Sequence, residues 1–273
     1  MIYVITAVHN RYKITEAFVE QLLMQSYKDI RLILVDDGCV DGTSDMVKEK
    51  MPDAIIIHGN GELWWGGALH EAYKWIKNNA KKDAYIMIAN DDTEFEPNYI
   101  ENAISFLQAK QHTLLTGYGI SKQTGKVIDA AINFDFKKSG FTKRNIGAGN
   151  CASTRSLFFR VTDFLLIGGF HPRVLPHYGS DYEWTIRASR KHQYLIFCDE
   201  KITYLVNEKT TGDNQYSSMT CKKMFSKRSS SNPIYKMIFI FMVTPCRLLP
   251  IAVWNQIGRY LKKWRLIIEI LKR

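Results

Sequence analysis

The sequence has few cysteines, and none of them lies at a spacing that binds metal. The 273 residues include five cysteines, an odd number, scattered along the chain without a C-x-x-C pair. Disulfide frameworks and zinc sites need paired or closely spaced cysteines, so this pattern argues against both. It favours a reducing compartment, and we expect the protein in the cytoplasm.

The sequence also lacks a secretory leader pattern and a long uninterrupted apolar run. Ile2–Val8 is apolar, but no basic residues precede it and no small-residue cleavage site follows it, which predicts a core strand rather than a signal peptide. The most apolar segment, 233–257, is interrupted by Pro245, Arg247 and Pro250. A helix that crosses a bilayer needs ~20 apolar residues, so we expect no transmembrane helix.

Acidic residues are almost absent from the end of the chain. Residues 222–273 hold twelve lysines and arginines and one acid, a net charge of +11, so that residues 1–221 carry −1 of a total of +10. Proteins that bind nucleic acid usually carry their basic patch on the folded module. Because that module is nearly neutral here, we expect no nucleic-acid partner.

The basic segment has the pattern of a helix that lies on a membrane surface. From Trp254 to Leu271, apolar residues recur at spacings of three and four and basic residues flank them. Anionic lipid attracts such a helix by about 1 kcal/mol for each basic residue near the surface. We expect residues 222–273 to form an amphipathic helical tail on an anionic membrane surface. The alternative is a helix that packs on the rest of the chain or on a second copy in a homodimer.

The first 110 residues alternate short β-branched runs with longer amphipathic stretches, which is typical of βαβ units around a parallel sheet. The strands are predicted at 2–8, 30–35, 54–58 and 84–89. The helices are predicted at 14–25, 42–50, 66–79 and 97–108, the last with Pro97 in its first turn. Residues 112–165 predict mixed strands at the sheet edge, with a turn at 124–125 and a glycine-rich loop at 147–150. A helix at 182–192 and a strand at 194–198 complete the module.

Carboxylates follow the fourth predicted strand. In parallel sheets ligands bind beyond the carboxyl ends of the strands, which places Asp91 and Asp92 at the ligand edge. Their oxygens suit Mg²⁺ or Mn²⁺ shared with substrate phosphates, and such an ion assists a leaving diphosphate. The alternative is that the run from Asn90 to Thr93 only supplies loop and helix-capping residues.

Polar residues also follow the first two strands. Asp37, with Asp36 beside it, can accept a hydrogen bond from the imide N–H of uracil or thymine. His9 is a candidate for stacking on the base and Arg11 for a phosphate contact. An Asp-Asp-Gly run is otherwise an ordinary turn, and a single histidine is more often structural than functional.

Two further motifs predict contacts with substrate. Asp181 begins a late helix and is a candidate general base, because transfer to a hydroxyl needs a proton acceptor within hydrogen-bond reach. It is otherwise a helix cap. Trp64 and Trp65 precede two glycines, which suits either a core position or close approach to a sugar or nucleotide.

Together these motifs resemble family 2 glycosyltransferases of the GT-A fold. The motifs are residues 5–11, 35–38 with 41–43, 61–68, 90–92 and 180–183, and the match runs over about residues 2–212, ending with 209–212. The resemblance implies an α/β fold in which helices flank a Rossmann-like mixed sheet. It also implies an inverting transfer, a single in-line displacement without a covalent intermediate.

The resemblance implies a role for each matched position. The metal ligand would be Asp92, and Asp181 would be the base. The nucleotide site would be lined by Ala7, His9, Arg11, Asp36, Asp37, Gly61, Trp65 and Asp91. Two positions depart from the common pattern: Asn90 opens the D-x-D-like motif, as in rhamnosyltransferase-like members, and Ser180 stands where many members have Glu.

The resulting hypothesis is a glycosyltransferase at the inner face of the cell membrane. It would move a sugar from a UDP- or dTDP-sugar donor to a hydroxyl of a glycan or lipid-linked acceptor in cell-surface polysaccharide synthesis. Residues 1–221 would form the GT-A domain, with a nucleotide-binding half at about 1–111 and an acceptor-binding half at about 112–221. A nucleotidyltransferase would need a glycine-rich phosphate loop that residues 9–11 lack. A sugar- or membrane-binding scaffold would need no positioned base.

Overall fold

The computed structural model describes residues 1–142, 147–208, 225–227 and 229–271. The motif at 209–212 and Cys221 lie outside these residues. A mixed sheet forms the centre, with strands in the order β3-β2-β1-β4-β11-β6-β12-β10. These strands are β1 (Ile2–Val8), β2 (Ile30–Asp36), β3 (Ile55–His58), β4 (Tyr85–Ala89), β6 (Thr113–Ser121), β10 (Ala148–Gly149), β11 (Ser156–Arg160) and β12 (Leu195–Val206). Strands β3, β2, β1 and β4 are parallel, and β11 runs antiparallel to its neighbours β4 and β6.

Helices cover both faces of the sheet, as the apolar pattern requires. Successive side chains of β1 point to opposite faces, so that Tyr3 and Ile5 join one core cluster while Ile2 and Val4 join the other. The first cluster contains residues of α3 (Trp64–Asn79), α5 (Val161–Ile167) and α6 (Ser180–His192). The second contains residues of α1 (Tyr12–Leu23), α2 (Thr43–Lys50) and α4 (Tyr99–Ala109). The predicted α/β sheet with flanking helices is confirmed.

Several predicted boundaries were wrong for identifiable reasons. Helix α4 begins at Tyr99, not at Pro97, because the Tyr99 amide is bound to the Glu96 carbonyl in a turn that precedes the helix. Helix α3 begins at Trp64, two residues earlier than predicted. The late strand was predicted to end at Cys198, but β12 continues to Val206 after a register shift against β6. Within the glycine-rich loop at 147–150, the short strand β10 pairs with β12.

The predicted mixed strands after residue 112 are present at the edge of the sheet. Strand β7 pairs with β6 across the predicted turn at 124–125. Strand β5, which precedes this segment and was not predicted, pairs with β12. A separate hairpin joins β8 to β9. The bounds of these strands are Thr93–Phe95 for β5, Val127–Asp129 for β7, Phe134–Asp135 for β8 and Gly140–Phe141 for β9.

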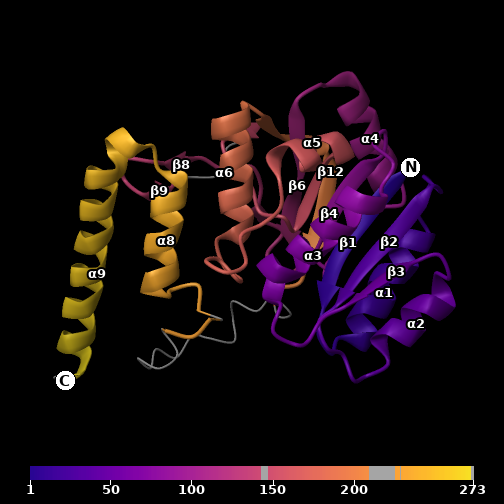
Figure 1. The fold of residues 1–273 in the computed structure, drawn as a ribbon, viewed down its shortest axis with the longest axis horizontal. Coiled ribbons are helices and arrows are strands. Elements are labelled where there is room, and N and C mark those ends of the chain that lie inside the picture. Colours follow the sequence, from indigo (N-terminus) through magenta and orange to yellow (C-terminus); the bar gives the residue numbers. More distant parts are fainter. Residues whose placement is uncertain (143–146, 209–224, 228, 272–273) are drawn as a thin grey trace.

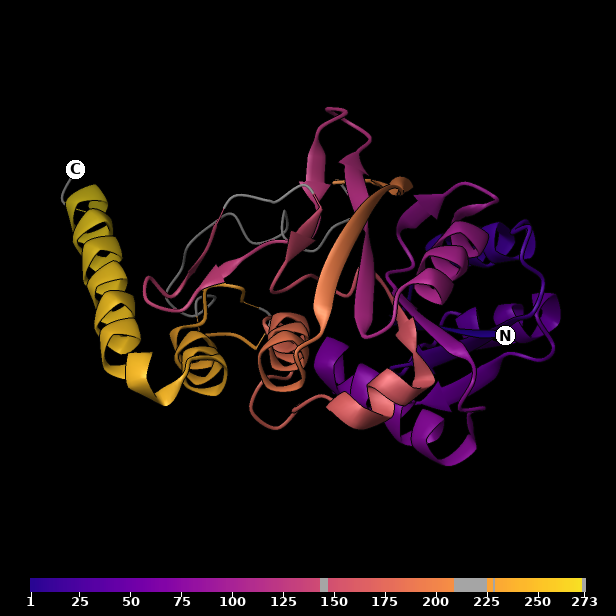
Figure 2. The ribbon, with the colours of Figure 1, turned by 90° about the horizontal axis from the view of Figure 1, so that it is seen from above.

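The tail folds as two helices that pack in series on the rest of the chain. Helix α8 (Pro233–Val243) lies between α6 and α9 (Leu249–Leu271), as Figures 1 and 2 show from two directions. Phe239 and Ile240 of α8 share a buried cluster with Ile186 of α6. Helix α9 reaches the β8–β9 hairpin, where the Arg259 guanidinium donates to the Ser139 carbonyl at 2.6 Å. Among the described residues, the helices are too short or too polar to cross a membrane.

Candidate active site

The carboxyl ends of the four parallel strands meet at one edge of the sheet. The residues that follow these strands come from four separate parts of the sequence, and the parallel register brings them to that edge. Most of the predicted nucleotide-site residues lie here. Ala7 is a partly buried residue of β1 opposite Val35 of β2.

Asp91 and Asp92 form a compact charged group with Arg11. Both carboxylates are buried, with 3% and 4% of their side-chain surface exposed. Arg11 Nε lies 3.2 Å from Asp91 Oδ2, and Arg11 Nη2 lies 3.5 Å from Asp92 Oδ2. One guanidinium therefore offsets part of the charge of two adjacent carboxylates. The sequence placed all three residues at the donor site, and the structure brings them into contact.

Asp91 is held by contacts from the loop after β1 and from α1. Burial raises the pKa of Asp91 to about 6, a shift that Arg11 opposes and Asp92 increases. The Thr15 hydroxyl of α1 donates to Asp91 Oδ2 at 3.0 Å. With Arg11 and Thr15 both on this oxygen, Asp91 suits a residue that orients the loop, and Asp92 remains the predicted metal ligand.

The Asp37 carboxylate binds the backbone of the segment that leads into α3. Its Oδ1 accepts from the amides of Gly61 at 2.8 Å and Leu63 at 3.2 Å, and its Oδ2 accepts from the Trp64 amide at 3.1 Å. The side chain belongs to a residue that is 8% exposed. The sequence predicted that Asp37 contacts the nucleotide base. In the structure its carboxylate binds the backbone of the loop between β3 and α3, next to the predicted base site.

Asp36 binds residues of the loop between β2 and α2 and of the first turn of α2. Burial works to raise the pKa of Asp36, but hydrogen bonds from the Ser44 hydroxyl and the Cys39 amide outweigh it and leave the pKa below its ordinary value. Asp36 thus fixes the turn between β2 and α2. In the same turn, Gly38 has a φ of +78°, and a Cβ there would come within 3.0 Å of the Gly61 amide nitrogen. A side chain would therefore separate the two loops.

His9 is exposed beside these loops, as a base-stacking residue must be. Its Nδ1 lies 2.6 Å from the Asp37 carbonyl oxygen, which only accepts, so Nδ1 carries the proton. This bond fixes the plane of the imidazole beside the loop after β2.

The two tryptophans face different surroundings. Trp65 packs against the core and its indole donates to the Thr154 hydroxyl at 2.8 Å, which favours the core reading of this residue. Trp64 has a φ of +57°, uncommon for a bulky side chain, and its ring lies 5.8 Å from that of His177. Of the pair, Trp64 is the one that contacts the loop before Asp181.

Asp181 lies in the first turn of α6. The N-cap position is Gly179, with a φ of +86°, so the reading of Ser180 or Asp181 as the cap was wrong. Asp181 Oδ1 accepts from the Tyr182 amide at 2.9 Å. Burial raises the pKa of Asp181 to about 6; the Tyr182 amide and Arg155 oppose the shift, and Asp129 increases it. A carboxyl with this pKa is suited to accept a proton near neutral pH.

Sequence reasoning missed two charged residues beside Asp181. Asp129 ends β7 and Arg155 precedes β11, and Arg155 Nε lies 3.6 Å from Asp129 Oδ2. The Arg155 carbonyl accepts from the Asn90 amide at 3.0 Å, directly before the Asp91–Asp92 pair. The sequence could have indicated Asp129, because it follows two apolar residues that predict a short strand. The partner 26 positions later was not recognisable without the fold.

Residues 3–163 match the sequence model described as glycosyl transferase family 2, which is more than half of the chain. The chain belongs to this family. The resemblance drawn from the motifs is confirmed. In this family 2 glycosyltransferase the matched segment runs from β1 into α5 and ends before Asp181.

Two solved structures share the fold of this chain. Mannosyltransferase PcManGT from Pyrobaculum calidifontis, in complex with GDP-Man and Mn²⁺, is 14% identical with a TM-score of 0.59, covering 98% of this chain and 80% of that one. TarS from S. aureus is 12% identical with a TM-score of 0.61, covering 95% of this chain and 54% of that one. At these identities the likeness shows the fold, and the predicted GT-A architecture is confirmed.

Two curated relatives are similar in sequence over part of their length. Glycosyltransferase GlyG of Streptococcus pneumoniae serotype 4 is 29% identical over 124 residues, 43% of this chain and 38% of GlyG. The Escherichia coli UDP-Glc:alpha-D-GlcNAc-diphosphoundecaprenol beta-1,3-glucosyltransferase WfaP is 30% identical over 112 residues, 41% of this chain and 43% of WfaP. The chain thus spans about two fifths of the length of each relative.

Proposed function

We propose that this glycosyltransferase carries out an inverting transfer from a nucleoside-diphosphate sugar, with Asp181 as the base. One connection carries the proposal. The charge of Arg155 acts on Asp181, and its backbone carbonyl binds the residue before the Asp91–Asp92 pair, so one residue connects the candidate base with the candidate diphosphate site. The anomeric carbon of a donor must lie between a base and a leaving diphosphate for in-line displacement. Asp181 then takes the proton of the attacking hydroxyl.

We also propose that a divalent cation, Mg²⁺ or Mn²⁺, binds at Asp92. Among the described residues no group of three or more His, Cys, Asp or Glu side chains could cage a metal ion. The neighbouring carboxylates of Asp91 and Asp92 are the kind of donors that suit an ion that takes one or two carboxylates and completes its shell with waters and substrate phosphates. When bound, such an ion stabilises the charge of the leaving diphosphate. The Mn²⁺ in the PcManGT complex supports this reading.

The donor is proposed to be a UDP- or dTDP-hexose whose nucleotide lies across the loops after β1, β2 and β3. The exposed, oriented ring of His9 and the closely packed loops around Asp37 and Gly61 support this site. Arg11 then lies where the diphosphate meets Asp91 and Asp92. Since PcManGT was solved with GDP-Man, guanine nucleotides belong in the test as well.

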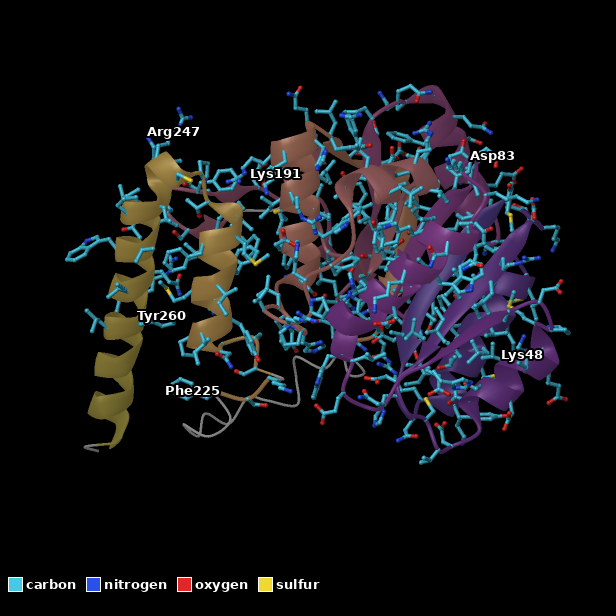
Figure 3. The ribbon with its side chains drawn as sticks, in the orientation of Figure 1. Lys48, Asp83, Lys191, Phe225, Arg247 and Tyr260 are labelled. Carbon is cyan, nitrogen blue, oxygen red and sulfur yellow. The ribbon has the colours of Figure 1, made fainter. Side chains whose placement is uncertain are left out.

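The acceptor is proposed to be a glycan or lipid-linked sugar in cell-surface polysaccharide synthesis, reached at the inner face of the cell membrane. The tail, residues 222–273, is proposed as the membrane contact of a catalytic domain at 1–221. Trp254 and Leu261 of α9 are 75% and 60% exposed, and Figure 3 shows Arg247 pointing away from the protein at the turn before α9. The name of WfaP, which includes a diphosphoundecaprenol acceptor, supports a lipid-linked substrate.

Nucleotide binding tests the donor site directly. Calorimetry with UDP, dTDP and GDP is run in Mn²⁺, Mg²⁺ or EDTA on the wild type and on Asp92→Ala. Metal-dependent binding that weakens in the variant is the expected result. Asp83→Ala is the matched control, because Asp83 is an exposed carboxylate at the opposite, N-terminal end of β4, labelled in Figure 3. Binding of none of the three nucleotides to the wild type overturns the donor site and favours the scaffold.

A further inference from the structure

Asp129 is a carboxylate held in place by several donors. Its Oδ2 accepts from the Ser153 hydroxyl at 2.6 Å and from the Tyr204 hydroxyl at 2.8 Å, and Arg155 Nε lies 3.6 Å away. Among the described residues these three contacts all go to Oδ2. The side chain keeps 16% of its surface exposed, so Oδ1 can accept hydrogen bonds from a ligand.

The backbone also fixes Asp129. The residue pairs with Gly119 of β6, and a Cβ at Gly119 would come within 2.8 Å of the Asp129 Cβ and 3.0 Å of the Tyr204 ring. Glycine at this position therefore allows β7 and the Tyr204 ring to approach each other closely. The result is a carboxylate whose position is set by three strands, β6, β7 and β12.

Two partners of Asp129 use its carboxylate structurally. Tyr204 is 1% exposed and its hydroxyl needs an acceptor, which an uncharged amide oxygen would also supply. Arg155 uses the charge in an ion pair. The same charge also acts on the ionisation of Asp181. Two neighbouring carboxylates repel each other, which is a cost to folding that suits a functional site.

Asp129 is linked to both ends of the proposed reaction. On one side Arg155, its ion-pair partner, is bonded through its backbone to Asn90 at the candidate diphosphate site. On the other side Ser153, which donates to Asp129, follows Ala152, and the Thr185 hydroxyl binds the carbonyls of both Ala152 and Asp181. In a glycosyl transfer, the part of the substrate between the diphosphate and the base is the ring of the transferred sugar. Its hydroxyls are the donors that a preoriented carboxylate would meet.

We propose that Asp129 accepts hydrogen bonds from hydroxyls of the transferred sugar and holds that sugar beside the candidate base Asp181. The inference rests on the proposed function and adds the residue that selects the sugar. Ser153, Tyr204 and Arg155 orient its carboxylate.

The charge of Asp129 also acts on Asp181, together with the other groups around that carboxyl. Asp181 faces Asp129 from β7, Arg155 from the segment before β11, the Cys151 thiol, and the Tyr182 phenol of its own helix. Burial raises the pKa of both the thiol and the phenol, so neither is charged near neutral pH. Removing the charge of Asp129 therefore leaves Arg155 as the charged neighbour, and the pKa of Asp181 falls.

The test compares nucleotides with nucleotide sugars. Calorimetry in Mn²⁺ measures UDP, dTDP and GDP, then UDP-glucose, dTDP-rhamnose and GDP-mannose, on the wild type, Asp129→Asn and Ser153→Ala. For the nucleotide that the wild type binds and its sugar derivative, Asp129→Asn is expected to weaken binding of the sugar nucleotide by about 10-fold or more. Binding of the free nucleotide should weaken by less than about twofold, because only the sugar loses charged hydrogen bonds. Ser153→Ala keeps the charge and is expected to weaken the sugar nucleotide by less.

A pH profile separates this role from a merely structural one. The rate of donor hydrolysis, with water as acceptor, is expected to rise through a pH about 0.5–1 unit lower in Asp129→Asn than in the wild type, and to be unshifted in Ser153→Ala. Unchanged sugar-nucleotide binding together with an unshifted profile in Asp129→Asn overturns the inference and leaves the glycosyltransferase intact. If Asp129→Asn does not fold, unchanged sugar-nucleotide affinity in Ser153→Ala overturns it. A wild type that binds no nucleotide overturns the proposed function instead.

Discussion

At the scale of single residues, the candidate site is a set of carboxylates whose surroundings differ. The carboxylates of Asp36 and Asp37 accept hydrogen bonds from backbone amides and a hydroxyl, which fixes both side chains in the loops. Asp91 is paired with Arg11. Asp181 is partly buried beside another acid, and burial raises its pKa to about 6. Burial raises the pKa of Asp91 to about 6 as well. Of these two, only Asp91 is in direct contact with an arginine of the described residues, which leaves Asp181 as the proposed base.

The first prediction concerns Asp181. Replacing it with Asn should lower the transfer rate by about 10²–10⁴-fold, the usual contribution of a general base. It should also raise Tm at pH 7–8. The folded pKa of about 6 lies above the ordinary 3.8, so the folded state holds the proton more tightly and wild-type stability falls as pH rises from about 4 to about 6. Above about pH 6 the ionised carboxylate of Asp181 lowers the unfolding free energy by its full amount, and the uncharged Asn side chain removes this loss.

Thermal unfolding from pH 3.5 to pH 8 checks this, with Asp83→Asn as the control on an exposed carboxylate. The stabilisation of the Asp181 variant should disappear at the acid end of the range. A variant that is equally or less stable than the wild type at pH 8 contradicts the burial of this charge.

The second prediction concerns Arg11. Removing its guanidinium in Arg11→Ala leaves Asp91 and Asp92 buried side by side without their cation. Because an uncompensated buried charge is costly, the variant should lose roughly 2–4 kcal/mol of unfolding free energy in EDTA. Mn²⁺ should recover part of this loss, giving a larger rise in Tm than in the wild type. An equal rise in Tm for both proteins argues against a cation at this pair of carboxylates.

At the scale of elements, the site depends on how helices are held at their N-terminal ends. The start of α3 is fixed by Asp37 from the loop after β2, across more than 20 residues of sequence. The start of α6 is fixed by Gly179, whose neighbour in space is Phe239 of α8. The two helix starts contact each other where the Gly66 amide donates to the Pro176 carbonyl at 2.9 Å. The loops of the donor side and the acceptor side are therefore packed together.

The third prediction concerns the Asp37 bond set. Asp37→Ala leaves three backbone amides without their acceptor and should lower the unfolding free energy by about 2–4 kcal/mol, measured in urea. Asp41→Ala is the matched control, because Asp41 also accepts from backbone amides, of Tyr12 and Thr43, but is exposed. It should cost about 1 kcal/mol. Equal losses of unfolding free energy in both variants would show that burial does not increase the contribution of Asp37 to stability.

At the scale of the whole molecule, the tail joins the side of the protein that carries Asp181. Helix α8 packs on α6, where the Arg190 guanidinium donates to the Val243 carbonyl at 2.6 Å. Helix α9 lies beyond it at the edge farthest from β1–β3 (Figures 1 and 2). A membrane bound to the outer face of α9 would therefore lie on the acceptor side of the domain.

The fourth prediction concerns membrane binding by α9. Replacing the exposed Trp254 and Leu261 together with Ser should weaken binding to vesicles that contain anionic lipid by about 10-fold or more, since each side chain contributes roughly 1–2 kcal/mol on burial. Nucleotide binding should not change. Leu195→Ser is the control, because Leu195 is 57% exposed on β12, outside the tail. Equal vesicle binding by all three proteins contradicts a membrane contact through this face.

The sequence by itself determined the parts of this protein that depend on local pattern. Alternating apolar runs located β1 and its parallel neighbours, and the residues that follow them were found to meet at one edge because parallel strands align their carboxyl ends. Only the tertiary structure decided which of those residues are already bound. It turned Asp37 toward the α3 backbone, brought Asp129 to Arg155, and packed α8 on α6. These contacts join segments whose separation in sequence carries no periodic signal, so no local pattern predicts them.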